Sequence, residues 1–574
     1  MSPNAIAPCS DDTEALPLPQ PSDQLQHPVV AFLAKAKRIW NSLQISHSGG
    51  KYSVERLLAL EEYARTTSLT RVLLVCIGTP LPMAIVIILQ ECAPLRDPSE
   101  GWSANYGFWI RAGVLGGIVA VGMAAFALSM IPGVVLSNLQ LALLCIGTGV
   151  SYPFAAMLVA ALWVFPIPFM ILTIISLYVT LFAGFFWLIV GKDVISEMGK
   201  HTDELILAVS FSGSQCMMAF VYAFYAVLFD HAANTHFEVP VILLLPIIKI
   251  IMKNLVSRTI VHMKDMAPEA VIFTVDFFNS MYLATCMQNA SSITTVLTMM
   301  AIDITQTIFE LRSLYYKTST IVARLEQANG SITGCGSLLP AVESICRDTT
   351  KFALQARENV ILDSCLPHKL SAEGRTLLET LKSVPGNGVR SIPRFSVVEL
   401  RDSFRSAVTQ TSVKPLRRGT KEGKGGLDMI ATPHKKILSE TLEVLFTTEC
   451  VVLTEYLESI IPVLYGNFVL LVVHLPSARY HKDLVGITPD NVGGTVSNIF
   501  ILATLEFASF IFLVFMMMKN CRLKALYHLA FVLETQMLLI QVKLVTWVLM
   551  SFSFRVEHFG VDFTFKFAWM NQGG

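Results

Sequence analysis

Long apolar runs, separated by short polar stretches, recur along most of this chain. A run of about 20 mostly apolar residues is the length that crosses the hydrocarbon core of a bilayer as a helix. Eleven such runs are expected, near residues 71–90, 108–130, 134–162, 166–190, 204–229, 239–257, 269–287, 293–311, 452–473, 494–518 and 525–550. The pattern predicts an all-α fold, a polytopic transmembrane helix bundle.

The eighth run, 293–311, carries a polar stripe. Asp303, Gln306 and Glu310 are spaced i, i+3, i+7, which places them on one face of a helix. An ionisable group at membrane depth costs roughly 2.5–3.5 kcal/mol on insertion scales, so such groups usually face protein or water. The stripe is therefore predicted to look into the bundle or into a cavity.

Other polar residues interrupt the apolar runs and are candidates for a substrate or ion pathway. They are Asp276, Asn279, Gln288, Asn289 and Glu534, in addition to the stripe at 303, 306 and 310. Glu534 and Gln541 share a helix face, and we expect them to meet the stripe. The alternative role for each of these side chains is to bond neighbouring helices together.

Six regions follow from this pattern. They are a disordered tail at 1–26, cytosolic amphipathic helices at 27–70, an eight-helix membrane block at 71–311, a helical cytosolic insert at 312–441, a three-helix membrane block at 442–550 and an aromatic outside tail at 551–574. Ser53 is the expected N-cap of a helix over 53–66. The basic stretch 27–46 suits either an anionic lipid surface or packing against the insert.

Lysine and arginine in the short loops set the orientation. Clusters before the first run and after the fourth, sixth, eighth and tenth fall on one side when the N-terminus is cytosolic; Lys249 and Lys253 are counted among them, at the end of the sixth. The insert should begin a helix at Ser396, with Glu399 completing a capping box. Thr420, in a basic Gly-rich run, is a possible phosphorylation site, although a solvated linker is the simpler interpretation.

Composition agrees with a membrane protein and offers little chemistry. Hydrophobic residues make up 53% of the 574 residues, charged residues only 15%, and the net charge is zero, so nucleic acid is not an expected partner. The eleven cysteines match no zinc spacing, and the chain has no phosphate-binding loop or catalytic triad signature. We expect no cofactor, no metal and no enzymatic activity.

Four stretches together carry a resemblance. They are GKYSVERLLALEEY at 50–63, PSEGW at 98–102, LPIIK at 245–249 and CMQN at 286–289. The chain resembles a large group of uncharacterised multi-pass membrane proteins from oomycetes, over most of residues 50–325. The resemblance implies a membrane location and supplies no activity, substrate or catalytic residue.

Two functions remain open. Multiple spans, proline-interrupted helices and buried acids favour a transporter or channel for a small or ionic solute, because acids at the midplane suit proton or cation coupling. The alternative is a membrane receptor or signalling scaffold that acts through its cytosolic insert. The sequence names neither a substrate nor the membrane in which the protein resides.

Overall fold

The computed structural model describes residues 50–130, 136–232, 235, 237–260, 266–290, 293–328, 338–350, 352, 360–383, 437–520 and 523–562. The fold is all-α, as predicted, and the described residues contain no β-strand. The helices are α2 Val54–Thr66, α3 Leu69–Gly78, α4 Leu81–Glu91, α5 Tyr106–Met130, α6 Asn138–Leu162, α7 Met170–Thr173, α8 Ile175–Val190, α9 Lys192–Lys200, α10 Thr202–Ala232, α11 Glu238–Thr259, α12 Ala267–Asn289, α13 Ile293–Ala328, α14 Leu338–Arg347, α16 Ala372–Ser383, α18 Ile437–Val472, α19 Val492–Asn520, α20 Ala525–Thr535 and α21 Met537–Ser553. Short 3-10 turns are η2 Pro98–Glu100, η3 Pro476–Tyr480, η4 Lys482–Leu484 and η5 Glu557–Phe559.

Eight helices in the described part of the chain are long and apolar enough to cross a membrane. They are Leu69–Glu91 (α3 with α4), Tyr106–Ala127, Asn138–Leu162, Thr202–Ala232, Glu238–Thr259, Ala267–Asn289, Ile437–Val472 and Val492–Lys519. The number rises to ten if two bent pairs each count as one span: α8 with α9, bent by 118°, and α20 with α21, bent by 83°. This set of helices fits a multi-pass integral membrane protein.

The prediction of eleven spans is not confirmed. The eighth predicted run is helical, but α13 is not among the helices apolar enough to cross. Asp303, Glu310 and Arg312 are the reason, since they interrupt its apolar length. The run at 525–550 is also not one straight helix, because the chain breaks at Gln536 between α20 and α21.

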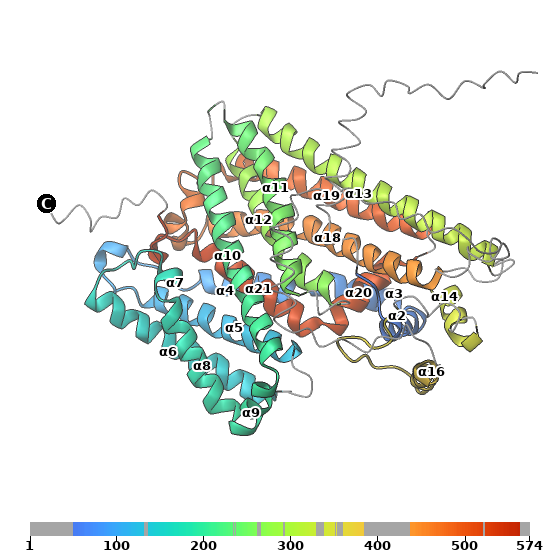
Figure 1. The fold of residues 1–574 in the computed structure, drawn as a ribbon. Coiled ribbons are helices and arrows are strands. Elements are labelled where there is room, and N and C mark those ends of the chain that lie inside the picture. The colour runs from blue at the N-terminus through green and yellow to red at the C-terminus, as the bar shows by residue number, and fades with distance from the viewer. Residues whose placement is uncertain are drawn as a thin grey trace, which may run out of the picture. The chain divides into compact units, whose positions relative to one another are not determined.

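The helix α12 is the core of the bundle. Every residue from Pro268 to Gln288 is buried, and α10, α11, α18, α19 and α21 all pack against it. Its main partner is α18, which also runs beside α19 along much of its length (Figure 1). A helix that is buried on all sides can carry polar residues only where neighbouring helices supply partners.

The helix α13 has the amphipathic character that its polar stripe predicts. Its apolar face is exposed at Leu297, Ile308 and Phe309, whereas Asp303 and Gln306 are half-buried. The helix packs against α11, α18 and α19. The stripe therefore faces the bundle, as predicted.

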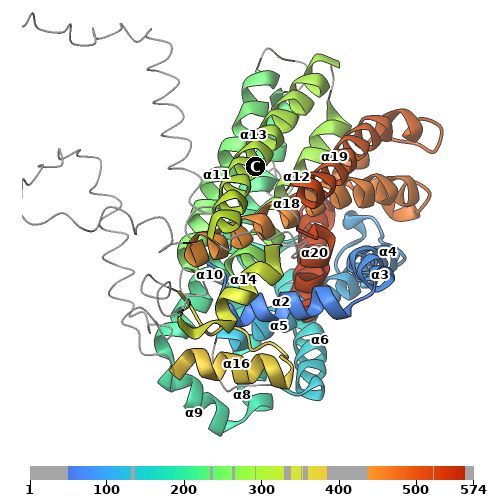
Figure 2. The ribbon, with the colours of Figure 1, turned by 90° about the vertical axis from the view of Figure 1, so that its right-hand side faces the viewer.

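The helical parts of the insert pack onto α2. Ser53 caps α2 as predicted, by accepting a hydrogen bond from the backbone N–H of Arg56. The carboxylate of Glu55 accepts from the backbone N–H groups of Ser364 and His368, both at 2.9 Å. Helices α14 and α16 lie next to α2 (Figure 2). The insert is thus joined to the segment that precedes the first membrane helix.

Several expectations lie outside the described residues. They concern the tail 1–26, the basic stretch 27–46, the start signal at Ser396, the phosphorylation site at Thr420 and residues 563–574 of the aromatic tail. The described part of that tail, 551–562, contains the end of α21 and η5.

Candidate functional site

Polar side chains form three layers along the apolar core, and α12 contributes to each. Glu269 belongs to the layer at the end of the bundle where α2 lies, Asp276 to a middle layer and Gln288 to the layer at the opposite end, near η3. At about 1.5 Å per residue, Glu269 and Gln288 are about 28 Å apart along the helix. That span is close to the thickness of the hydrocarbon core, about 30 Å.

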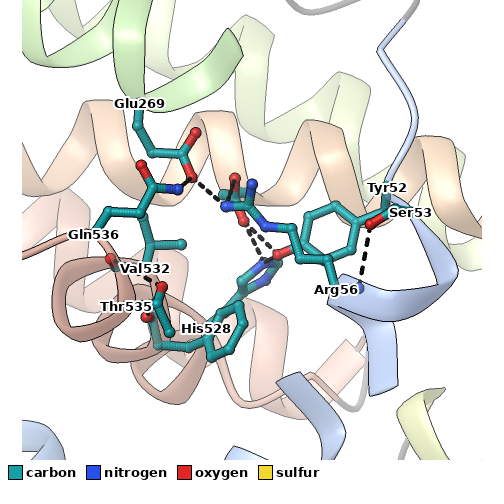
Figure 3. A network of polar contacts seen from close by, with 10 residues as sticks. Tyr52, Ser53, Arg56, Glu269, His528, Val532, Thr535 and Gln536 are labelled. Atoms are coloured by element: carbon teal, nitrogen blue, oxygen red, sulfur yellow. Dashed lines mark hydrogen bonds and ion pairs between the residues drawn. The ribbon is translucent and has the colours of Figure 1, made fainter. Parts of the chain in front are cut away.

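The layer at the α2 end is the Arg56 network, formed by Tyr52, Arg56, Glu269, Glu449, His528 and Gln536. Arg56 pairs with Glu269 (Figure 3). It also pairs with Glu449, at 2.8 Å. The Tyr52 hydroxyl donates to Glu449 and lies 2.7 Å from His528 Nε2.

Burial raises the pKa of Tyr52 well above its ordinary value, so this hydroxyl acts as a donor and not as an acid. The Arg56 guanidinium thus bridges a carboxylate from α12 and one from α18. Each of these two carboxylates also accepts a hydrogen bond from another side chain. The network joins α2 to the two central helices.

The layer at the η3 end is the Arg555 network, formed by Thr285, Gln288, Tyr465, Asp483 and Arg555. Arg555 pairs with Asp483 at 2.6 Å and donates to Tyr465 and Thr285. Gln288 accepts from the Tyr465 hydroxyl and donates to the Asp483 carbonyl, both at 2.7 Å. Arg555 thus meets a carboxylate, and Gln288 meets both a donor and an acceptor, so this layer ties the helix ends together.

A second cluster at the η3 end surrounds Glu91. Its carboxylate pairs with Arg111 at 2.9 Å and lies 3.1 Å from His481 Nε2, and all three side chains are buried. Arg111 also donates to the Ala93 carbonyl at 2.7 Å. The Glu91 carboxylate thus has a cation and a second side chain beside it, as a charge buried in a protein usually requires.

The middle layer begins with two lysines on α11. Lys249 pairs with Glu458 at 2.6 Å and lies 3.4 Å from Asp276, while Lys253 pairs with Asp276 at 2.9 Å. Thr454 donates to the other oxygen of Asp276 at 3.3 Å. Both lysines are almost fully buried, so these ammonium groups lie inside the bundle and not in a loop.

Four more carboxyl groups adjoin these ion pairs, those of Asp303, Glu310, Glu455 and Glu506. Glu455 accepts from Ser509 at 2.7 Å, and it interacts electrostatically with Asp303, Glu310 and Lys249. Glu458 interacts electrostatically with Asp303 and Glu455 in addition to Lys249. We call this layer the acidic centre and define it by its charged residues, Lys249, Lys253, Asp276, Asp303, Glu310, Glu455, Glu458 and Glu506.

Glu506 differs from every other acid described above. Only 2% of its surface is exposed, and no donor group gives a hydrogen bond to either carboxyl oxygen. The side chain that acts on it most strongly is Asp303, another carboxyl, which repels it when both are ionised and can share a hydrogen bond with it when one is protonated. The acidic centre thus contains six carboxyl groups and two ammonium groups, and the excess acid is concentrated between α13 and α19.

A small pocket reaches this centre between α11, α12 and α13. Its volume is about 30 Å³, and its polar lining residues are Lys249, Asn279, Asp303 and Gln306. A volume of about 30 Å³ is the share of one water molecule in the liquid. The Oδ1 atom of Asn279 is buried without a hydrogen-bond partner. The pocket therefore offers water-sized space beside the carboxyl of Asp303.

The candidates from sequence divide among these places. Asp276, Asn279, Asp303, Gln306 and Glu310 come together at the acidic centre. Gln288 belongs to the Arg555 network, and Asn289 donates to Asp230 at 3.0 Å. These two positions tie the helix ends.

The expectation that Glu534 meets the stripe is wrong. Its carboxylate accepts from the Tyr63 hydroxyl at 2.8 Å and pairs with Arg71, so it fastens α20 to α2 and α3. The bend at Gln536 is the reason, because it separates Glu534 from the helix that carries Gln541.

Sequence reasoning missed the cations of the site. Lys249 and Lys253 were counted as charges in a cytosolic loop, but they lie four residues apart on the inner face of α11 and bind acids. The surrounding sequence, LPIIKIIMKNL, indicates their position, because apolar residues continue the helix past both lysines. Glu455, Glu458 and Glu506 were visible as charges within apolar runs, but their partners were not.

No group of three or more His, Cys, Asp or Glu side chains within the described ranges is arranged to hold a metal ion. The comparisons with known proteins add no functional assignment. No protein-family model, no curated protein and no solved structure matches this chain.

Proposed function

We propose that the protein is a transporter or channel for a small or ionic solute, and that the acidic centre is its proton-handling site. The observation that carries this proposal is Glu506. The neighbour of this buried carboxyl is another carboxyl, that of Asp303, so the two can share a hydrogen bond only when one of them holds a proton. Buried ionisable groups of this kind in membrane proteins mark proton relays and ion pathways.

The charge balance of the acidic centre supports the same proposal. Lys249 and Lys253 can neutralise two of the six carboxyl groups, and no other cation joins the centre in the contacts described. Carboxyl groups close together at low dielectric constant cannot all be ionised without a large energetic cost. Protonation of some of these carboxyl groups removes the cost. The protons would be exchanged with water in the adjoining pocket, so the site would bind and release protons.

The two flanking layers support a division of labour. The Arg56 and Arg555 networks match their carboxylates with cations and hydrogen-bond donors, so they hold the ends of α12 and α18 in place. The acidic centre lies between them and has fewer cations and hydrogen-bond donors than its six carboxyl groups require. A rigid frame around a site that changes its charge is the arrangement that ion coupling requires.

A second function, signalling through the insert, has one specific observation in its favour. The segment that contains Ser364 and His368 is bonded to Glu55, and the next residue on α2, Arg56, reaches the carboxylates of the buried network. A change in the bundle would thus reach the insert through one turn of helix.

The test compares the same substitution, glutamate to glutamine, at two buried positions, Glu506 and Glu91. Purified protein is reconstituted into liposomes loaded with a pH-sensitive dye, and a potassium diffusion potential drives proton entry. Wild-type protein should acidify the lumen faster than protein-free liposomes. Glu506→Gln should reduce the rate to that of protein-free liposomes, with thermal stability unchanged, and Asp303→Asn should behave in the same way.

Glu91→Gln is the matched control. It removes a carboxylate that Arg111 and His481 both contact, so it should lower the free energy of unfolding by about 3–5 kcal/mol. Proton flux per folded molecule should remain. The proposal fails if wild-type protein gives no proton flux above background, or if Glu506→Gln loses stability and flux to the same extent as Glu91→Gln.

A further inference from the structure

A second, separate cavity lies on the other side of the bundle, between α5, α6, α8, α10 and α21. Its volume is about 370 Å³, within the range of sites for small molecules, and its lining is overwhelmingly apolar. Ile175, Val179 and Val209 belong to its wall and are themselves exposed apolar residues. The cavity is therefore reached from the apolar surface of the bundle, where lipid chains would lie.

One charged side chain lines this cavity, the lysine at 543 on α21. Its ammonium group lies 5.5 Å from the ring centre of Phe126 and 5.6 Å from that of Phe211, and these two rings stack on each other. No carboxylate forms an ion pair with Lys543 in the described part of the chain. The acid that acts on it from a distance, Glu269, is already engaged by Arg56 and Gln536.

Two further donors without partners come from the same helix. Thr546 and Trp547 line the cavity at i+3 and i+4 from Lys543, so the three residues share one face of α21. Thr546 Oγ1 and Trp547 Nε1 are both buried and make no hydrogen bond. Trp547 can only donate, and a lysine ammonium can only donate.

Three other polar residues in the wall have hydrogen-bond partners within the protein. The Tyr178 hydroxyl donates to the Gly116 carbonyl at 2.8 Å, Ser212 donates to the Ala208 carbonyl at 2.9 Å, and Gln215 donates to Thr274 at 3.2 Å. The unpaired donors of Thr546 and Trp547 thus lie on α21, beside one positive charge. The missing component is an anionic acceptor.

We propose that this cavity binds a single-chain carboxylic acid of the fatty-acid class, with its carboxylate at Lys543 and its chain against the apolar wall. At about 30 Å³ for a water-sized group, the cavity holds on the order of a dozen such groups, which suits one acyl chain and is too small for the two chains of a phospholipid. The carboxylate supplies the acceptor that Lys543, Thr546 and Trp547 lack. This site is independent of the acidic centre.

The test uses two molecules with one chain and different headgroups. Purified protein in detergent is titrated with decanoic acid and with decan-1-ol, and each displaces a fluorescent fatty acid from the protein. Wild-type protein should bind the acid at least tenfold more tightly than the alcohol, a difference of about 1.4 kcal/mol. Lys543→Met should bind both with the affinity of the alcohol, and Lys543→Arg should keep the preference for the acid.

Lys519→Met is the matched control, because Lys519 also lies over an aromatic ring, that of Phe515 at 5.8 Å, but is exposed at the end of α19. It should leave the preference unchanged. Equal binding of acid and alcohol by wild-type protein overturns the proposal, as does a preference that survives in Lys543→Met. Displacement of the probe by phosphatidic acid as readily as by decanoic acid also overturns it, because a two-chain lipid would then be the ligand.

Discussion

Buried charges in this protein differ in how many ion pairs and hydrogen bonds they make, and that difference predicts how much each one contributes to stability. Arg56 is 1% exposed and pairs with two carboxylates, whereas Arg71, with a side chain 62% exposed, pairs with Glu534 near the surface. An exposed pair contributes at most about 1 kcal/mol, while removal of one partner from a buried pair strands the other charge.

Arg56→Met should therefore lower the free energy of unfolding by about 3–5 kcal/mol, because Glu269 and Glu449 would lose their shared cation. Arg71→Met should change it far less, because water already screens the exposed pair of Arg71 with Glu534. Thermal unfolding of the purified variants in one detergent measures both. Equal losses at the two positions would show that burial of Arg56 does not determine its contribution.

His558 gives the protein a dependence on pH. Burial lowers its pKa to about 4 from an ordinary 6.5, and its Nε2 lies 2.7 Å from the Arg96 carbonyl. The unfolded chain therefore binds more protons between pH 6.5 and 4, so stability falls as the pH is lowered through that window, by about 3 kcal/mol at most. His558→Gln should flatten the melting temperature between pH 7 and 5; an unchanged slope would assign the effect to other groups.

At the scale of elements, α2 is the connection between the insert and the bundle. One side of it carries Arg56 into the buried network, and the other presents Glu55 to the backbone of the insert. The carboxylate of Glu55 replaces the helix or sheet partners that the backbone N–H groups of Ser364 and His368 would otherwise require.

Glu55→Gln should loosen the segment 360–371, because a neutral amide oxygen accepts more weakly than a carboxylate and only one oxygen remains to serve both donors. Hydrogen exchange followed by mass spectrometry should show faster exchange in that segment, with α18 and α19 unchanged. Thr376→Ala, at an exposed position of α16, is the control. Uniformly faster exchange would instead indicate general destabilisation.

At the scale of the whole molecule, η2 follows the first membrane helix, whereas α16 packs against α2, which precedes that helix. The two therefore lie on opposite sides of the membrane, with α16 inside if the N-terminus is cytosolic. A cysteine at Ser99 in η2, with Cys92 changed to serine, should react with a membrane-impermeant maleimide on intact cells. A cysteine at Glu379 in α16 should react only after permeabilisation. The reverse result would invert the orientation.

The sequence alone determined the all-α fold, most of the membrane helices, the cap of α2 at Ser53 and the inward direction of the stripe at 303, 306 and 310. These features depend on local periodicity, and a helix presents the same face whatever packs against it. It did not determine the bend at Gln536 that sends Glu534 toward Arg71.

Only the tertiary structure decided which buried charges are partners. Lys249 meets Glu458 across 209 positions of the chain, and Glu506 is left beside Asp303 without a donor. Apolar runs show where helices form but not which helices are neighbours. The energy of a buried charge depends on atoms within a few ångströms, and in a bundle those atoms belong to helices remote in sequence.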